Sequence, residues 1–145
     1  MKKSQKCYCL LLLCAGVIVC ATARSTASAT PSENGIPSAM VLAEAVMCET
    51  IQNFRPVNPA VVFSISHGEI FCYSNFSPVY TKTHIFHKWY KRDKLIFTMR
   101  LTLSPPKWAS FSSIKIRDED KGPWRVDITD ETDMRLQTLR FSIAD

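Results

Sequence analysis

The chain has 145 residues, of which 18 are basic and 13 acidic, and its formal net charge at pH 7 is +5. Three of the lysines lie within residues 1–23, which contain no acid, so the rest of the chain has 15 basic and 13 acidic residues, or +2. A nucleic-acid-binding domain usually carries a marked basic excess. The composition therefore argues against nucleic acid as a partner.

The N-terminus has the pattern of a secretory signal peptide. A basic start is followed by an apolar run over residues 8–20 and by small residues at 21–23 and 27–29, the spacing that signal peptidase recognises. We expect residues 1–23 to be a signal peptide, with cleavage as late as residue 29. The alternative is an uncleaved inner-membrane anchor, although a spanning helix needs about 20 apolar residues. The predicted location is periplasmic or secreted, with membrane attachment only if the segment is kept.

Residues 24–38, RSTASATPSENGIPS, are small, polar and interrupted by Pro and Gly, which is typical of a flexible linker. We expect residues 39–145 to form one domain. At residues 40–51, MVLAEAVMCETI, the Ala, Glu and Met content favours a helix, whereas the position suits a first strand. We predict a strand there, because the patterns that follow are all β.

Short strand patterns separated by turn residues continue to the C-terminus. AVVFSIS at 60–66 and IFCYSNF at 70–76 flank a His-Gly-Glu turn and predict a hairpin, and THIFHKWYK at 83–91 and KLIFTMRLTL at 94–103 predict another. The last of these alternates as a half-buried strand, with Leu95, Phe97, Met99, Leu101 and Leu103 on one face. Further strands are expected within 107–116, 123–129 and 135–143. The prediction is an all-β fold, an immunoglobulin-like antiparallel β-sandwich of about seven strands.

Three tryptophan-containing elements stand in the second half of the chain: His87-Lys88-Trp89, Trp108 to Ser112, and Gly122 to Val126. They resemble the H-x-W, W-x-x-x-S and G-x-W-R-V elements of a bacterial family known as domain of unknown function 2914 (DUF2914). The resemblance covers roughly Val41 to Ile143. It implies a small secreted or membrane-attached domain and carries no assigned activity, so it implies no catalytic residue.

Cys48 and Cys72 are the two cysteines that follow the predicted signal peptide. In an oxidising compartment such a pair predicts one disulfide. The alternative is two buried free thiols, because free cysteine behaves as a small hydrophobic residue.

We expect no cofactor, no metal site and no enzymatic activity. His84 and His87 are an odd number of residues apart, so on a strand they point to opposite faces and cannot share an ion. The acidic loops RDEDKG and DITDETD lack the spacing of an EF-hand and suit solvated turns. The chain has no G-x-S-x-G nucleophile motif.

The same alternation sorts the residues of 83–94 into an inner and an outer set. We expect structural roles for six residues: Cys48, Cys72, His87, Trp89, Trp108 and Trp124. The candidate binding face contains five others: His84, Lys88, Tyr90, Lys91 and Arg92. Charges at a hairpin edge can simply prevent edge-to-edge pairing, and binding of an anionic glycan is the sharper hypothesis.

The predicted function is a secreted or periplasmic, non-catalytic binding or interaction module with an unknown ligand. One alternative is a carbohydrate-active or enzyme-accessory domain that binds an anionic glycan through the 88–94 hairpin. Another is a structural envelope domain. The expected partners are an envelope protein or a glycan.

Overall fold

The computed structural model describes residues 39–145, and the predicted signal peptide and linker lie outside them. Residues 40–51 form a strand, as predicted. Within the described residues the strands are β1 (Met40–Gln52), β2 (Arg55–Pro59), β3 (Val62–Ser64), β4 (Glu69–Val79), β5 (Thr83–Lys91), β6 (Lys94–Leu103), β7 (Trp108–Lys115), β8 (Gly122–Asp130) and β9 (Arg135–Ala144), with short 3-10 helices η1 (Ile65–His67) and η2 (Asp118–Asp120).

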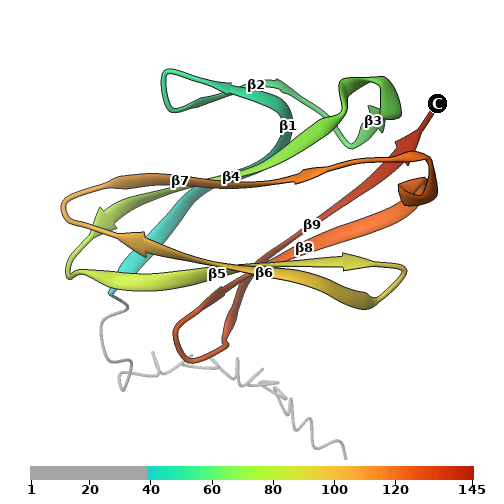
Figure 1. The fold of residues 1–145 in the computed structure, drawn as a ribbon. Helices are drawn as coiled ribbons and strands as arrows, with labels where there is room; N and C mark the ends of the chain where they lie inside the picture. The colour runs from blue at the N-terminus through green and yellow to red at the C-terminus, as the bar shows by residue number, and fades with distance from the viewer. Residues whose placement is uncertain (1–38) are drawn as a thin grey trace, which may run out of the picture. The chain divides into compact units, whose positions relative to one another are not determined.

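The strands form two sheets that pack face to face (Figure 1). Sheet A has the order β2-β1-β4-β7, and sheet B has the order β3-β9-β8-β5-β6. Neighbouring strands are antiparallel except for β3 and β9, which are parallel. The predicted β-sandwich is confirmed, with nine strands rather than about seven in the described part of the chain.

The predicted hairpin of residues 60–66 with 70–76 is wrong. The Ser64 side chain accepts a hydrogen bond from the Ser66 amide and starts η1, which ends at Gly68 in a left-handed conformation with φ 72°. This turn separates β3 from β4. β3 pairs with β9 in sheet B, whereas β4 lies between β1 and β7 in sheet A.

The core fills the space between the sheets. In β5, buried residues alternate with half-buried ones, so that Ile85, His87 and Trp89 face inward. Phe141 is the centre of an aromatic cluster, with its ring centroid 6.1 Å from that of Trp89 and 6.2 Å from that of Trp124. Each large apolar side chain buried in this way stabilises the fold by about 1.5–3 kcal/mol.

β6 departs from the predicted alternation at a β-bulge. Trp89 pairs with Phe97 but Tyr90 pairs with Leu95, so Ile96 is an extra residue in β6. Leu95 therefore lies on the opposite face from Phe97, contrary to the prediction, and is 48% exposed. β6 is also the last strand of its sheet, which leaves much of it uncovered.

The disulfide prediction is wrong, because Cys48 and Cys72 are both free and buried. Cys72 pairs with Met47 across β1 and β4, and Cys48 pairs with Phe71. The two cysteines are therefore one position out of register, and their side chains point to opposite faces of sheet A. Burial raises the pKa of the Cys48 thiol to about 11.

Candidate functional site

Two of the tryptophan-containing sequence elements meet in the core. Ser112 Oγ accepts a hydrogen bond from Trp89 Nε1 at 3.0 Å and lies 2.9 Å from His87 Nδ1. On the other side of the ring, His87 Nε2 lies 3.0 Å from Ser74 Oγ, which donates to the Ser110 carbonyl at 3.4 Å. Because His87 and Trp89 belong to sheet B and the three serines to sheet A, the network joins the two sheets.

One tautomer of His87 satisfies every member of the network. The Ser74 hydroxyl proton is committed to the Ser110 carbonyl, so Ser74 Oγ accepts from Nε2–H. Nδ1 is then the acceptor for the Ser112 hydroxyl. Desolvation by burial lowers the pKa of His87 from 6.5 to about 4, so the ring is neutral at pH 7. His87 is 0% exposed, which closes this serine–histidine contact to any substrate.

The five residues of the predicted binding face do not form one surface. His84, Lys88 and Tyr90 lie on the outer face of sheet B, whereas Lys91 is on the opposite side of β5, where it pairs with Trp124 in the β-ladder. Arg92 is exposed in the β5–β6 turn with φ 47°.

Most of these side chains already have partners within the fold. Lys88 forms an ion pair with Asp133, and the Lys91 ammonium lies 3.0 Å from an Asp120 carboxylate oxygen. The Lys88 partner holds the pKa of Asp133 below its usual range. His84 Nδ1 is 3.1 Å from Thr102 Oγ1.

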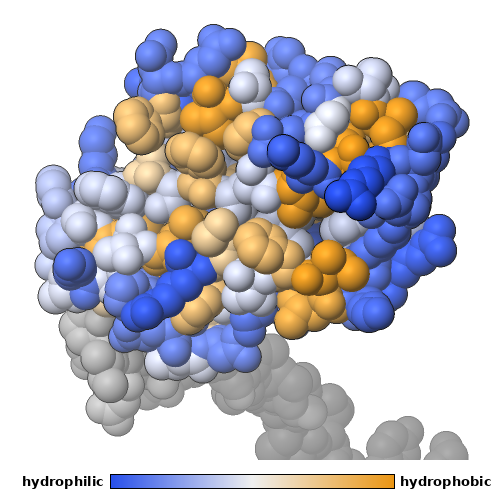
Figure 2. All heavy atoms as spheres, in the orientation of Figure 1, coloured by the Kyte–Doolittle hydropathy of each residue, from blue (hydrophilic) through white to orange (hydrophobic). Residues whose placement is uncertain are grey.

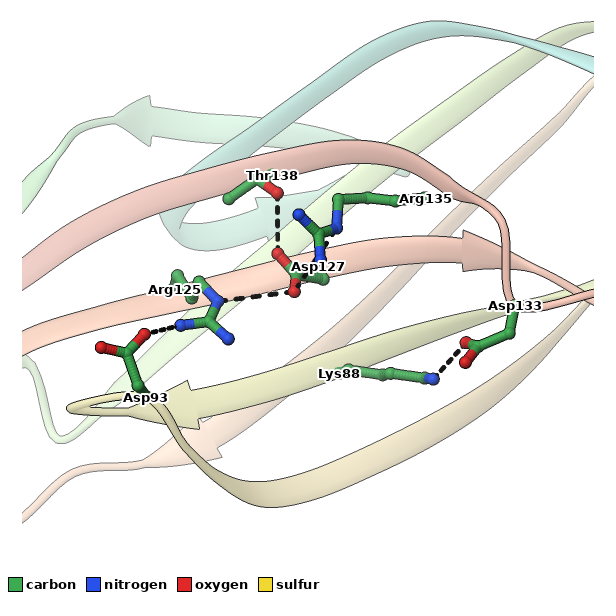
Figure 3. Close-up of polar contacts among 7 residues, drawn as sticks. All are labelled: Lys88, Asp93, Arg125, Asp127, Asp133, Arg135 and Thr138. Atoms are coloured by element: carbon green, nitrogen blue, oxygen red, sulfur yellow. Dashed lines mark hydrogen bonds and ion pairs between the residues drawn. The ribbon is translucent and has the colours of Figure 1, made fainter.

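Figure 3 shows that the outer face of sheet B is organised around Asp127. This carboxylate is 2% exposed and accepts a hydrogen bond from Thr138 Oγ1 at 2.7 Å. Its other oxygen lies 3.4 Å from Arg125 Nε and 3.8 Å from Arg135 Nε. Arg125 also pairs with Asp93 in the β5–β6 turn. Within this network the acidic and basic groups therefore neutralise one another.

The acidic loops and the histidines are dispersed in the same way. Asp130 accepts hydrogen bonds from the amides of Thr132 and Met134, and His67 pairs with Glu49 at 3.1 Å. Residues 39–145 contain no group of three or more His, Cys, Asp or Glu side chains placed to hold a metal ion. The same residues contain no helix with the length and apolarity needed to cross a bilayer.

A groove of about 720 Å³ lies on sheet A, between the β1–β2 hairpin and the start of β7. Its aromatic lining residues are Phe54, Tyr73 and Trp108. Trp108 was expected to be structural, but it is 43% exposed. It is the first residue of β7, two positions after Pro106, and so stands at an end of sheet A.

The polar lining of the groove is arranged by the strand register. Glu44, Asn75 and Ala109 stand side by side on β1, β4 and β7 and line the groove together. Burial raises the pKa of Tyr73, and the nearby Glu44 carboxylate raises it further, whereas Arg55 lowers it.

The tip of the β1–β2 hairpin holds an exposed ring in an unfavourable backbone conformation. Asn53 and Phe54 have φ values of 50° and 57°, as in a type I′ turn, and Gln52 pairs with Arg55 on either side. Asn tolerates this region, but a bulky residue such as Phe rarely adopts it. Phe54 nevertheless stands there and is 72% exposed. An exposed, strained aromatic residue beside a groove is a candidate ligand contact.

A second apolar region lies on the side of the sandwich where the end strands β6 and β7 come together (Figures 1 and 2). Figure 2 shows apolar side chains spread across this side, with hydrophilic ones around them. The exposed apolar residues of the two strands are Leu95, Ile96 and Met99 on β6, and Trp108 and Phe111 on β7. Each of the two strands has one unpaired edge within the described domain.

Sequence reasoning missed the groove because its residues come from four separate segments, at 44, 53–59, 73–75 and 107–109. The available signal was the stretch NFRPVNP, in which an aromatic residue stands at a turn between Asn and Pro. Trp108, taken as structural, was the other signal.

Comparison with known proteins relates the second half of the chain to a family. Residues 82–143, from just before β5 almost to the end of β9, match a family described as protein of unknown function (DUF2914). No curated protein matches the chain. The match includes all three tryptophan-containing elements but begins after β4, so it is shorter than the resemblance noted in the sequence. The resemblance to the DUF2914 family is therefore confirmed over residues 82–143.

Proposed function

We propose that the chain is a secreted or periplasmic, non-catalytic binding module whose groove on sheet A holds a segment of a glycan chain. The observation that carries this proposal is Phe54, a ring that is 72% exposed at φ 57°, where glycine would be the unstrained residue. Phe54 lines the same groove as the exposed Trp108.

The composition of the groove suits a sugar ligand. Exposed Trp and Phe rings offer flat apolar surfaces to the ring faces of a sugar. Asn53, Asn75 and Glu44 add amide and carboxylate groups that can hydrogen-bond hydroxyl groups. Apolar surface with a few convergent polar groups is the usual composition of a ligand site. The ionisable side chains of the groove are Glu44, Arg55, Tyr73 and Lys107. Only one of them is a carboxylate, so the groove lacks the pair of carboxylates that hydrolysis of a glycan commonly uses. Binding of a glycan requires no such pair.

The test is titration of the protein with a β-1,4-linked N-acetylglucosamine hexamer and with cellohexaose. Trp89 and Trp124 are buried, so a change in tryptophan fluorescence on binding would report on Trp108. We expect saturable binding to at least one hexasaccharide. Calorimetry should show that Trp108→Ala weakens it by about tenfold or more, the effect of losing a central aromatic contact.

Phe111→Ala is the matched control, because Phe111 is a 39% exposed aromatic residue of the same strand that does not line the groove. It should leave the affinity unchanged. Equal losses from both substitutions, or no saturable binding of either hexasaccharide, would contradict the glycan-binding proposal.

A second candidate function is self-association through the β6 edge. β6 is a ten-residue end strand without proline, and Leu95 and Ile96 are about half exposed, a combination prone to edge pairing. In an antiparallel pair of two copies centred on Thr98, Arg100 of one copy stands opposite Ile96 of the other. No two cations then face each other. Sedimentation should detect a dimer that Ile96→Lys abolishes, and a monomer at high protein concentration would exclude this candidate.

A further inference from the structure

A small hollow of about 90 Å³ lies next to the β5–β6 turn, and none of its lining residues lines the groove. Three arginines converge on it: Arg92, Arg125 and Arg140. Because one water occupies about 30 Å³ in the liquid, the hollow has room for a single oxyanion group rather than for a whole sugar ring.

Of the three arginines around this hollow, Arg125 pairs with Asp93 and Asp127, whereas Arg92 and Arg140 have no carboxylate partner among residues 39–145. Arg125 on β8 and Arg140 on β9 stand directly opposite each other in the ladder. Like charges in this position destabilise a sheet. Within residues 39–145, neither Arg92 nor Arg140 forms an ion pair with a carboxylate, in contrast to Lys88 and Lys91. An anion between these arginines would relieve the repulsion.

The fold holds the Arg125 side chain in place and anchors the backbone of Arg92. The Arg125 guanidinium lies over the Tyr90 ring, 4.0 Å from its centroid, and its Nε contacts Asp127. The Arg92 amide donates to the Pro123 carbonyl at 3.2 Å, and its guanidinium lies against Gly122. A guanidinium fixed in this way offers a preorganised fork of donors to an oxyanion.

The carboxylate of Asp93 marks the position that such an anion would take. It belongs to the β5–β6 turn, pairs with Arg125, and its side chain is 86% exposed. It is therefore a surface carboxylate in contact with one arginine of the hollow, and an external anion could replace it by rotation of its side chain into water.

We propose that the hollow formed by Arg92, Arg125 and Arg140 is an oxyanion site, which binds a carboxylate, sulfate or phosphate group of a ligand in place of Asp93. The site is separate from the groove, and the two proposals are tested by substitutions at different residues.

The first test follows the arginine side-chain Nε–H signals by NMR while sodium sulfate, sodium phosphate or sodium acetate replaces sodium chloride at constant ionic strength. We expect the signals of all three arginines to shift with a common midpoint for at least one oxyanion. Arg140→Gln should weaken binding by about tenfold, as expected for the loss of a charged hydrogen-bond donor. Arg100→Gln, on β6 and outside the hollow, should leave the midpoint unchanged.

The decisive pair of variants removes the same charge at two places on sheet B. Asp93→Asn frees Arg125 and should tighten anion binding several-fold, whereas Asp133→Asn, which removes the partner of Lys88, should change it less than about twofold. Equal gains from the two variants would show general electrostatic attraction and overturn the site. Shifts that do not saturate with any of the three oxyanions would overturn it as well.

If the site holds, titration with a galacturonate trimer and with a sulfated trisaccharide of equal length identifies the acid group. A lower midpoint with the uronate assigns carboxylates, and a lower midpoint with the sulfated sugar assigns tetrahedral oxyanions. Because the readout is the arginine signals rather than Trp108, loss of glycan binding in the groove would not change either result.

Discussion

Two of the hairpin turns of the domain share positive φ values but have opposite surroundings. Asn53–Phe54 in sheet A and Arg92–Asp93 in sheet B are two-residue turns in which both residues have positive φ. Asp93 uses its side chain for an ion pair with Arg125. Phe54 leaves its ring in water at the rim of the groove. One strained turn residue supports the fold, whereas the other has no structural compensation.

The outer faces of the two sheets differ in the same way. On sheet B, Asp127 gathers Arg125, Arg135 and Thr138 into one network. In the groove of sheet A, Glu44 and Lys107 form no ion pair within the described residues. Polar groups satisfied inside the fold stabilise it, and those left free are available to a ligand.

The largest expected effect is the pH dependence of the free energy of unfolding that arises from His87, in the core between the two sheets. His87 has a folded-state pKa of about 4 against 6.5 when unfolded, so between these pH values the unfolded state binds the extra proton. Its contribution is complete above pH 6.5 and is lost as the pH falls to 4, by about 1.4 kcal/mol per pH unit and about 3 kcal/mol in all. Urea unfolding at several pH values should show this slope.

His87→Gln is the control for this prediction, because it removes the titrating group. Its free energy of unfolding should be lower than that of the wild type at pH 8, and the difference should shrink towards pH 4. A constant difference across that range would mean that His87 has the same pKa in the folded and unfolded states, and would contradict the prediction.

The next largest effect separates the two outer faces. Asp127→Ala should lower the free energy of unfolding by about 2–3 kcal/mol, because the half-buried Thr138 hydroxyl and Arg125 lose a charged partner. Glu44→Ala in the groove should change it by less than about 0.5 kcal/mol, as surface substitutions usually do. Urea denaturation of both variants measures the two changes in the free energy of unfolding. Equal losses of stability would contradict the contrast between the two outer faces.

A smaller effect of opposite sign is expected at the groove turn. Phe54→Gly relieves the left-handed strain, about 1–2 kcal/mol, and makes the unfolded chain more flexible, which offsets part of the gain. Thermal unfolding should show a net stabilisation of about 0.5–1 kcal/mol, together with weaker binding of the hexasaccharide. A variant that is both less stable and fully competent in binding would contradict a ligand-contacting role for Phe54.

Features of the fold that depend on neighbouring residues could be predicted from the sequence, whereas features that depend on a partner strand could not. Strand alternation depends on adjacent residues, and it places His87 and Trp89 on the face that the structure buries. The bulge at Ile96 and the register of Cys48 against Phe71 depend on a partner strand, so the face of Leu95 and the disulfide between Cys48 and Cys72 were predicted wrongly.

The candidate site was harder to predict for the same reason. Lys88 and Lys91 form a basic cluster in the sequence, but their carboxylate partners are Asp133 and Asp120, which are far along the chain. A cluster of like charges in sequence therefore did not indicate a free charged surface. Trp108 became a groove residue only through the β4–β7 pairing and the turn at Phe54.

The smallest expected effect is that of a glycine substitution in the β5–β6 turn, where the backbone strain to be relieved is smaller. Asp tolerates the left-handed region better than Phe, and Asp93→Gly also removes an exposed ion pair that contributes at most about 1 kcal/mol. The two changes oppose each other, so thermal unfolding should place Asp93→Gly within about 0.5 kcal/mol of the wild type. A stabilisation equal to that of Phe54→Gly would mean that the Asp93 side chain is as free as the Phe54 ring. The two turns would then contribute equally to stability, and they would differ only in the ligands that they are proposed to bind.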